Sequence, residues 1–387
     1  MGMKKYTVRL CIVFLFFPPF FVSATAFHSD GEELFFLSKR GRYYGIYVQT
    51  PQSMHCIFDS TELLKMFPNR ASYHVTYDVS RDGRFFTYSA MSETGSMDIF
   101  LTDLSSFHTR NLTRDSFVDG MPRFSHDGKW IGYLSHAPGE RMRDNLFLIS
   151  RDGMEIGKVK RQLSFGMYRI LSFCFSPDDR EILFVKYFNS RSTVITRVEI
   201  EGMKEWELTL PTCSSRNPSF NGKGDRIVYS SDCDGDFDLW IMNRDGSGRK
   251  RLYGSPGYES EPVFASDESR VLLFSDFSQG MGKVIDGTLI YSIRIDGTGL
   301  RNLTPEFFMR RTFVFSQLRY EEGKRVYYFQ GKQRDSRRGR YYEVYTLDPE
   351  RKEIKKISRG SFDKMNPLLR TRIHRVINVP FSPGRKL

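Results

Sequence analysis

The stretch NPSFNGKGDRIVYSSDCDGDFDLWIMNRDGSGRKRL, residues 217–252, holds both halves of a motif that recurs along this chain of 387 residues. In the first half, an apolar residue precedes a small polar pair, an Asp-Gly-like turn and a short apolar strand ending in Ser. In the second half, an apolar-aromatic strand leads into an Asp-Gly turn and a basic segment. Copies of the first half begin at the anchoring residues Val79, Phe124, Phe175, Phe220 and Phe264.

These anchors are roughly 45 to 50 residues apart, and each unit contains only strand-like patterning. Aromatic and β-branched residues fill the runs, and Asp-Gly supplies the positive-φ positions of tight hairpins. Proline stands before the expected innermost strand of several units, where its missing N–H costs no ladder bond, at Pro122, Pro218, Pro262 and Pro367. The sequence therefore predicts an all-β fold, a β-propeller with one four-stranded blade per repeat.

The two ends of the chain decide the number of blades. Residues 310–358 carry a degraded repeat, and residues 33–60 carry only the later part of one, without an innermost strand. The segment NPLLRT, residues 366–371, matches the missing strand. We therefore predict seven blades in a ring closed by the N- and C-terminal strands, or six if one end packs outside the ring. Residues 27–387 would form this single propeller domain.

Residues 1–26 have the pattern of a signal peptide. Lys4, Lys5 and Arg9 give a basic start, an almost wholly apolar run follows, and Ala-Thr-Ala at residues 24–26 fits a cleavage site. The apolar run is short for a membrane span, and an uncleaved anchor is the alternative. We expect a periplasmic or secreted protein with no integral membrane span after cleavage.

The formal net charge is +12, and the basic excess is concentrated late in the sequence. On an exported protein, such a face meets anionic lipid headgroups, an acidic glycan or an acidic protein more readily than nucleic acid. We therefore expect no nucleic-acid partner. The alternative is that these charges only keep a large β protein soluble. The predicted basic face contains Arg334, Arg337, Arg338 and Arg340.

Cysteine usage fits an oxidising compartment without fixing a pairing. Removal of the signal peptide would leave Cys56, Cys174, Cys213 and Cys233, which allow three pairings. Cys213 with Cys233 is the pair to test. Packing of lone cysteines as small apolar residues is the alternative.

Two sets of residues raise the question of a metal. Closely spaced aspartates at residues 232–238 offer oxygen ligands, but their loop lacks the distant Glu of an EF-hand and matches the ordinary repeat turn. Among the histidines, His126 falls in a turn and His108 near an outer strand, and only His74 lies near the start of an inner strand. We therefore expect neither a metal nor another cofactor.

Ligands of propellers usually meet the residues that begin the innermost strands, where all blades converge. Alignment on Phe124 gives the predicted ligand-binding set of the central funnel: Thr76, Met121, Ser172, Asn217, Glu261, Thr312 and Asn366. Neighbouring positions on the rim would be His74, Asp119, Arg216 and Glu259. Such polar groups bind a peptide or glycan, or only hold ordered water in a narrow channel.

The segments FSHDGKWIGYLS and FSPDDREILFV, together with residues 217–252, resemble the repeats of TolB-type β-propellers. The resemblance covers about residues 33–369. It implies an exported protein of WD-like repeats with a binding or scaffold role in the cell envelope. The sequence lacks a counterpart of the α/β domain that precedes the propeller in TolB. It also lacks the hydrolase domain with a G-x-S-x-G motif that propeller peptidases carry.

The sequence favours a propeller that recognises an envelope protein or glycan over an enzyme, since no nucleophile–base pair or phosphate loop is evident. The alternative is a propeller hydrolase or lyase acting on an envelope or extracellular glycan. In that case, Glu261 or Glu259 would act with His74 at the funnel. We assign no catalytic residue.

Overall fold

The computed structural model describes residues 26–27, 33–40, 43–49 and 54–59 as strands. It then describes residues 76–140, 143–152, 161–164, 166, 168–189, 192–305, 313–321, 326–333 and 343–356. These residues form strands β1 to β28 and no helix, so the predicted all-β fold is confirmed for them. Within the same residues, no helix has the length and apolar character needed to cross a membrane.

The N-terminal sheet has the order β1-β2-β3-β4. Its strands are β1 (Ala26–Phe27), β2 (Glu33–Arg40), β3 (Tyr43–Gln49) and β4 (Met54–Asp59). The sequence indicated no strand before Glu33, but Ala26 and Phe27 pair with Leu34 and Glu33 of β2. A strand of two residues is too short to show a periodic pattern, so the sequence did not predict β1. Residues 366–371, predicted to take this place, lie outside the described residues.

The next sheet has eight strands and consists of two four-stranded meanders. The first contains β5 (Tyr77–Val79), β6 (Phe85–Met91), β7 (Met97–Asp103) and β8 (His108–Asn111). The second contains β9 (Val118–Phe124), β10 (Trp130–His136), β11 (Asn145–Ser150) and β12 (Arg161–Gln162). A single parallel pair, Met97 with Val118, joins β7 to β9.

Four further sheets are antiparallel meanders of four strands each. One contains β13 (Ile170–Phe175), β14 (Glu181–Tyr187), β15 (Thr193–Glu199) and β16 (Glu205–Glu207). The next contains β17 (Ser215–Phe220), β18 (Arg226–Ser231), β19 (Asp238–Asn243) and β20 (Lys250–Tyr253). The third contains β21 (Glu259–Phe264), β22 (Arg270–Ser278), β23 (Lys283–Arg294) and β24 (Arg301–Asn302). The last contains β25 (Phe313–Glu321), β26 (Val326–Gln333), β27 (Glu343–Asp348) and β28 (Glu353–Lys356).

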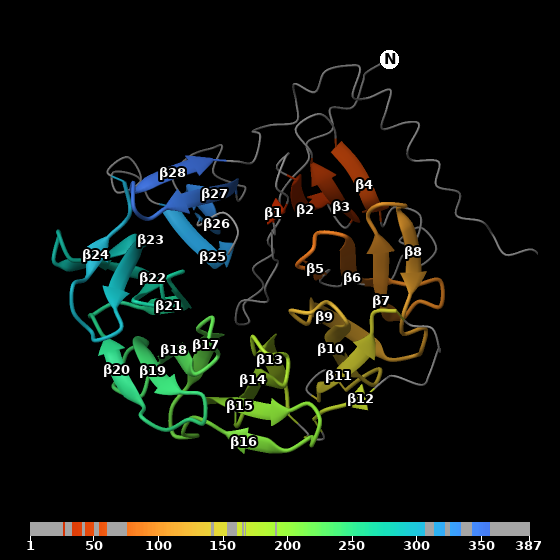
Figure 1. The fold of residues 1–387 in the computed structure, drawn as a ribbon, viewed down its shortest axis with the longest axis horizontal. Helices are drawn as coiled ribbons and strands as arrows, with labels where there is room; N and C mark the ends of the chain where they lie inside the picture. Colours follow the sequence, from red (N-terminus) through yellow and green to blue (C-terminus); the bar gives the residue numbers. More distant parts are fainter. Residues whose placement is uncertain are drawn as a thin grey trace, which may run out of the picture.

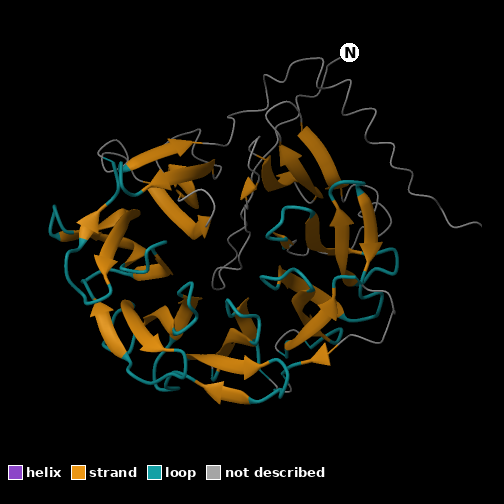
Figure 2. Cartoon of the chain, viewed as in Figure 1, coloured by secondary structure: helices purple, strands orange, loops and turns teal. Residues whose placement is uncertain are grey.

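The sheets are arranged around a common centre (Figure 1), with the first strand of each meander toward the middle and the fourth at the outside. Figure 2 shows that loops and turns connect the strands in the described parts. A radial arrangement of four-stranded meanders is the architecture of a β-propeller.

A buried polar residue follows four of the five anchors and explains the first half of the repeated motif. The Ser125 hydroxyl donates to Asp127, with 2.7 Å between the oxygens, and accepts from the Trp130 N–H at 3.0 Å. Gly128 follows with a φ of 67°, a left-handed conformation that favours glycine. The motif is therefore the turn between the first two strands of a meander. The same place in other turns is held by Ser80, Ser176 and Asn221.

Two of these turns carry an acidic residue where the others have glycine. Asp179 and Glu268 have φ angles of 53° and 57°. The Asp179 carboxylate accepts from the N–H groups of His126 at 2.8 Å and Asp127 at 2.7 Å, in the turn of the preceding meander. Glu268 accepts from the Lys223 N–H at 2.9 Å in the same way. These bonds between meanders offset part of the backbone strain.

The core consists of apolar layers between consecutive meanders. One layer contains Phe274 of β22, Phe315 of β25 and Phe329 of β26, all buried. The ring centroids of Phe315 and Phe329 are 5.1 Å apart in an edge-to-face arrangement. Similar layers lie between the other consecutive meanders from β5 to β24. The meanders from β5 to β28 are therefore stabilised by apolar burial against one another.

Candidate functional site

Three residues of the predicted funnel share an unusual backbone. Met121, Asn217 and Glu261 have φ angles of 54°, 51° and 49°, and each precedes a proline. At each place the register shifts, so that two residues of the innermost strand oppose one residue of its partner. These irregularities are β-bulges, which bend a strand and change the direction of its side chains.

The repeated bulge has an energetic cost. A left-handed backbone is unfavourable for any residue with a Cβ atom, and the residue before proline is normally extended. The proline itself has no N–H to lose where the ladder is interrupted. Strained backbone of this kind clusters at functional sites. The bulges therefore mark this part of the innermost strands as the candidate site.

Exposure separates the members of the set by role. Thr76, directly before β5, is 4% exposed and Met121 is 8% exposed, so neither offers its side chain to a ligand. Ser172, Asn217 and Glu261 are partly exposed. These three are the members within the described residues that a ligand can reach.

The register of β25 revises one position of the set. Thr312 and Asn366 lie outside the described residues. In β25 the register shifts between Ser316 and Arg319, which puts Gln317 at the bulge. Gln317, rather than Thr312, is therefore equivalent to the residues above. The segment SQLRY, which parallels GMPRF of β9, carries this signal in the sequence.

Side chains at these positions also link the innermost strands of neighbouring meanders. Thr76 Oγ1 accepts from the Met121 N–H at 2.7 Å, and Asp78 accepts from another backbone N–H of β9 at 2.9 Å. Glu261 Oε2 accepts from the Leu318 N–H of β25 at 3.3 Å. Part of the set therefore stabilises the ring, a role that the sequence did not indicate.

The rim residue Glu259 has a buried carboxyl group. It is 0% exposed, and its Oε1 accepts from the hydroxyls of Ser255 at 2.6 Å and Ser275 at 2.8 Å. Burial, more than the nearby charge of Asp238, raises the pKa of Glu259 to about 7. Because the group is enclosed, it belongs to the interior of the ring and not to an open binding surface.

The other rim residues differ in their surroundings. Arg216 is partly exposed, and its guanidinium lies 5.0 Å from the centre of the Phe237 ring, which is a cation–π distance. Asp119 is buried beside β7. His74 lies outside the described residues.

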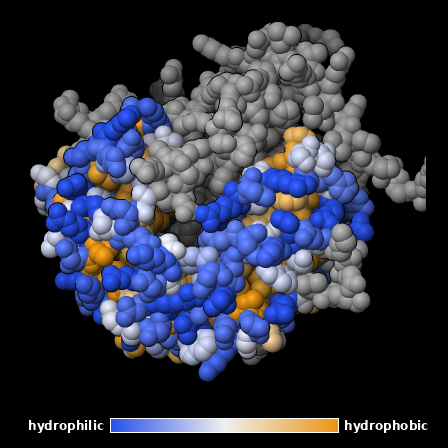
Figure 3. All heavy atoms as spheres, viewed as in Figure 1, coloured by the Kyte–Doolittle hydropathy of each residue, from blue (hydrophilic) through white to orange (hydrophobic). Residues whose placement is uncertain are grey.

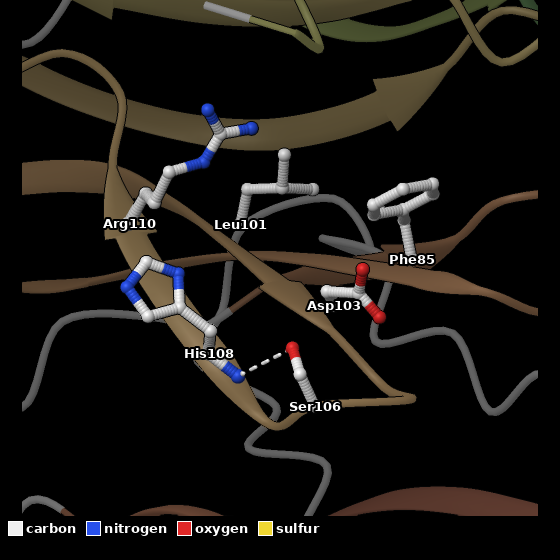
Figure 4. A pocket seen from close by; sticks show the side chains of 6 residues that line it. All are labelled: Phe85, Leu101, Asp103, Ser106, His108 and Arg110. Atoms are coloured by element: carbon white, nitrogen blue, oxygen red, sulfur yellow. Dashed lines mark hydrogen bonds between the residues drawn. The ribbon is translucent and has the colours of Figure 1, made fainter.

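A cavity of about 340 Å³ lies on β6, β7 and β8, apart from the innermost strands (Figure 4). Its lining residues are Phe85, Leu101, Asp103, Ser106, His108 and Arg110. A hydrogen bond from Ser105 is the largest cause that lowers the pKa of Asp103 to about 2. Arg110 donates to two backbone carbonyl groups of the next meander. The charged groups of Asp103 and Arg110 therefore both form hydrogen bonds within the protein.

Residues considered for a metal have protein partners in the structure. Asp234 and Asp238 face the guanidinium of Arg251, at 3.6 Å and 3.0 Å. His126 lies in a turn, and His108 lies in the outermost strand of its meander, as the sequence predicted. These positions do not bring the two histidines to the innermost strands.

Cys213 and Cys233 form a disulfide, with Cα atoms 5.0 Å apart. Cys174 is free, and burial raises the pKa of its thiol to about 12. Cys56 lies in β4. The basic face, Arg334, Arg337, Arg338 and Arg340, lies outside the described residues.

The face of the ring in Figure 3 is mostly hydrophilic, with hydrophobic residues in smaller patches. Large apolar side chains that are exposed, such as Phe188 and Met281, occur singly along the described residues. This face therefore shows no large continuous apolar patch outside the grey atoms.

No protein-family model matches the chain. Its sequence is 28% identical over 193 residues to an uncharacterized protein of Agrobacterium fabrum, a match that covers 49% of this chain and 60% of that protein. The chain thus spans less than two thirds of the length of this curated relative.

Several solved structures have a similar fold at low sequence identity. A puromycin-hydrolyzing peptidase of Mycobacterium tuberculosis has a TM-score of 0.66 and 12% identity, over 87% of this chain and 53% of that one. Oligogalacturonate lyase in complex with manganese has a TM-score of 0.57 and 12% identity, over 88% and 86%. TolB from Acinetobacter baumannii has a TM-score of 0.44 and 15% identity, over 67% and 59%, which is too low to define a shared fold. The first two similarities concern the propeller fold alone.

Proposed function

We propose that this protein is an exported β-propeller that recognises a protein or glycan partner in the cell envelope. The observation that carries the proposal is the recurrence of a partly exposed polar residue at the same place in neighbouring innermost strands. Asn217 and Glu261 offer an amide and a carboxylate at their bulges. Ser172 follows the bulge of β13 and offers a hydroxyl beside them. Such groups bind sugar hydroxyls or peptide groups without reacting with them.

A binding role also agrees with the chemistry of the carboxyl groups. Among the described residues, the acidic side chain whose pKa is raised to about 7 is Glu259, a value suited to proton transfer. This group is enclosed by the fold, so a substrate cannot reach it. Glu261 is partly exposed and instead accepts a backbone N–H of the next innermost strand.

We further propose a ring of seven blades. Strands β1 to β28 divide into seven meanders of four when the eight-stranded sheet is counted as two. Cleavage behind Ala26 would remove half of β1. In the mature chain, residues 366–371 would then take the place of β1 beside β2 and close the ring.

The proposed location is the periplasm or the extracellular space. The pattern of residues 1–26 supports export. The Cys213–Cys233 disulfide agrees with an oxidising compartment. The basic face would add attraction toward an acidic glycan or an anionic surface.

Substitutions in the funnel test the binding role. The mature wild type, Asn217→Ala, Glu261→Ala and the pair Arg337→Ala/Arg338→Ala would be immobilised and incubated with separated envelope proteins and envelope glycans. We expect Asn217→Ala and Glu261→Ala to weaken capture by about 1–3 kcal/mol, roughly ten- to a hundredfold in affinity, because each leaves a partner group without its hydrogen bond. Mass spectrometry would identify and quantify the captured molecules.

Lys283→Ala is the control, since Lys283 is exposed on β23. If only the arginine pair weakens capture, recognition belongs to the outer surface and the funnel is structural. A second candidate is a lyase for an acidic glycan, favoured by the similarity to oligogalacturonate lyase. Release of unsaturated product from oligogalacturonate by the wild type, and its loss in Glu261→Gln, would decide for that enzyme.

A further inference from the structure

Three aspartates, one from β7, one from β9 and one from the segment that leads into β9, meet where β7 and β9 lie side by side (Figure 1). Oxygen atoms of Asp98, Asp115 and Asp119 all lie within 4.8 Å of one another. Asp98 and Asp119 are 0% and 1% exposed, and Asp115 is half-buried. The parallel pair of Met97 with Val118 brings the two buried aspartates together, because each is the next residue of its strand.

A second junction of the same kind lies between β19 and β21. There, the buried Glu259 accepts from two hydroxyls, those of Ser255 and Ser275. Asp238 of β19 accepts from the guanidinium of Arg251 at 3.0 Å. Two hydroxyl donors and one cation therefore compensate two carboxyl groups.

The two junctions correspond position by position along the repeated motif. Asp98 corresponds to Asp238, Asn111 to Arg251, Asp115 to Ser255, Asp119 to Glu259 and Ser135 to Ser275. At Asp115 a third carboxylate thus replaces a hydroxyl donor. At Asn111 a neutral amide, which donates to Asp98 at 2.6 Å, replaces the cation. The first junction therefore has one more carboxylate and one cation fewer than the second, at a place where burial makes each added negative charge costly.

Ser135 supplies a second and independent observation. It is directly opposite Asp119 in the β9–β10 pair, so both side chains lie on the same face of the sheet. Ser135 is 1% exposed, and its hydroxyl has no hydrogen-bond partner among the described residues. Its counterpart Ser275 donates to Glu259 at 2.8 Å. A buried hydroxyl without a partner costs free energy, unless a bound ligand satisfies it.

We propose that Asp98, Asp115, Asp119 and Ser135 bind one hard divalent cation, with Ca²⁺ as the expected ion. All the donors are oxygen atoms, and Ca²⁺ takes six to eight oxygen ligands at about 2.3–2.6 Å, which agrees with the separations within the cluster. The half-buried Asp115 gives the ion access, and water would complete the coordination.

Calcium binding by the mature chain tests this site. The chelator-treated wild type would be titrated calorimetrically with CaCl₂, and with MgCl₂ and MnCl₂ in separate arms. We expect one Ca²⁺ per chain and a melting temperature that rises with calcium concentration, because the ion binds the folded state. Asp115→Ser restores the hydroxyl of the second junction, and Asn111→Arg restores its cation. Each should weaken calcium binding about tenfold or more and melt no lower than the metal-free wild type.

Glu259→Gln is the matched control in the second junction, and it should bind calcium as the wild type does. The proposal is overturned if the wild type gives neither heat of binding nor a melting shift in millimolar calcium. Equal calcium affinity of the wild type and Asp115→Ser would also overturn it. Tighter binding of Mg²⁺ or Mn²⁺, again lost in Asp115→Ser, would support the cation site with another ion.

Discussion

Asp179 has a left-handed backbone although it is not glycine, and its carboxylate accepts two backbone N–H groups of the neighbouring turn. Met203 has the same φ of 53°, but its side chain is exposed. The first residue therefore combines strain with compensating hydrogen bonds, and the second has the strain without a side-chain bond to offset it. Glycine substitutions at the two positions separate these effects.

We predict that Asp179→Gly lowers the free energy of unfolding by about 1 kcal/mol, because the loss of charge-assisted hydrogen bonds exceeds the relief of strain. Met203→Gly, the control, should be neutral or stabilising, since relief of strain offsets the greater freedom of the unfolded chain. Urea unfolding of both variants measures the difference. Equal changes in the two variants would show that the Asp179 carboxylate contributes nothing.

Glu259 links stability to pH. Burial raises the pKa of its carboxyl from the ordinary 4.5 to about 7 in the folded chain. Between these values the folded state keeps a proton that the unfolded state has lost. The stabilising contribution of this group is therefore complete below about pH 4.5 and declines until about pH 7. We predict that urea unfolding shows this decline in the wild type but not in Glu259→Gln, which mimics the protonated form. Parallel pH profiles of the two proteins would contradict the prediction.

At the scale of strands, the repeated motif predicted the turns and the apolar strands. It did not predict the features that depend on how strands pair with one another. Turns and apolar strands follow from the motif, because each apolar run is buried against neighbouring meanders. The alignment assigned the funnel position of the repeat that contains β25 to Thr312 instead of Gln317, because Gln317 is followed by leucine, whereas Asn217 is followed by proline. The acidic cluster was missed altogether. Asp98 and Asp119 meet only through a parallel pair that no pattern within one strand reveals.

The alignment of the repeats put Met121, Asn217 and Glu261 at equivalent positions, but it did not indicate how exposed each side chain is. Asn217 and Glu261 are partly exposed at their bulges, whereas Met121 at the same place is buried. This difference depends on how neighbouring meanders pack, since Thr76 accepts the Met121 N–H from across the junction. A single sequence does not contain that information.

The edge of β2 leads to a prediction about ring closure. β1 pairs with Leu34 and Glu33 at one end of β2, which is 8 residues long. If residues 366–371 take this edge in the mature chain, deletion of residues 366–387 should markedly lower the melting temperature, because an inner edge loses its partner. Deletion of residues 376–387, which keeps the strand, is the control. Equal melting of the mature protein and both truncated forms would show that another segment closes the ring.

At the scale of the whole molecule, each apolar layer among the meanders from β5 to β28 is shared by two meanders, as with Phe274 of β22 and Phe315 of β25. The repeat in the sequence corresponds to one meander, whereas each apolar layer lies between two meanders. The sequence repeat and the packing unit therefore have different boundaries. A single repeat encodes half of one interface and half of the next, so it cannot be gained, lost or exchanged alone without leaving two mismatched surfaces. Substitutions in one repeat, such as the degraded copy at residues 310–358, therefore require compensating substitutions in the neighbouring repeats. Selection in such a chain would act on the interfaces between meanders. Pairs of residues that face each other across these interfaces would then be expected to change together among related sequences.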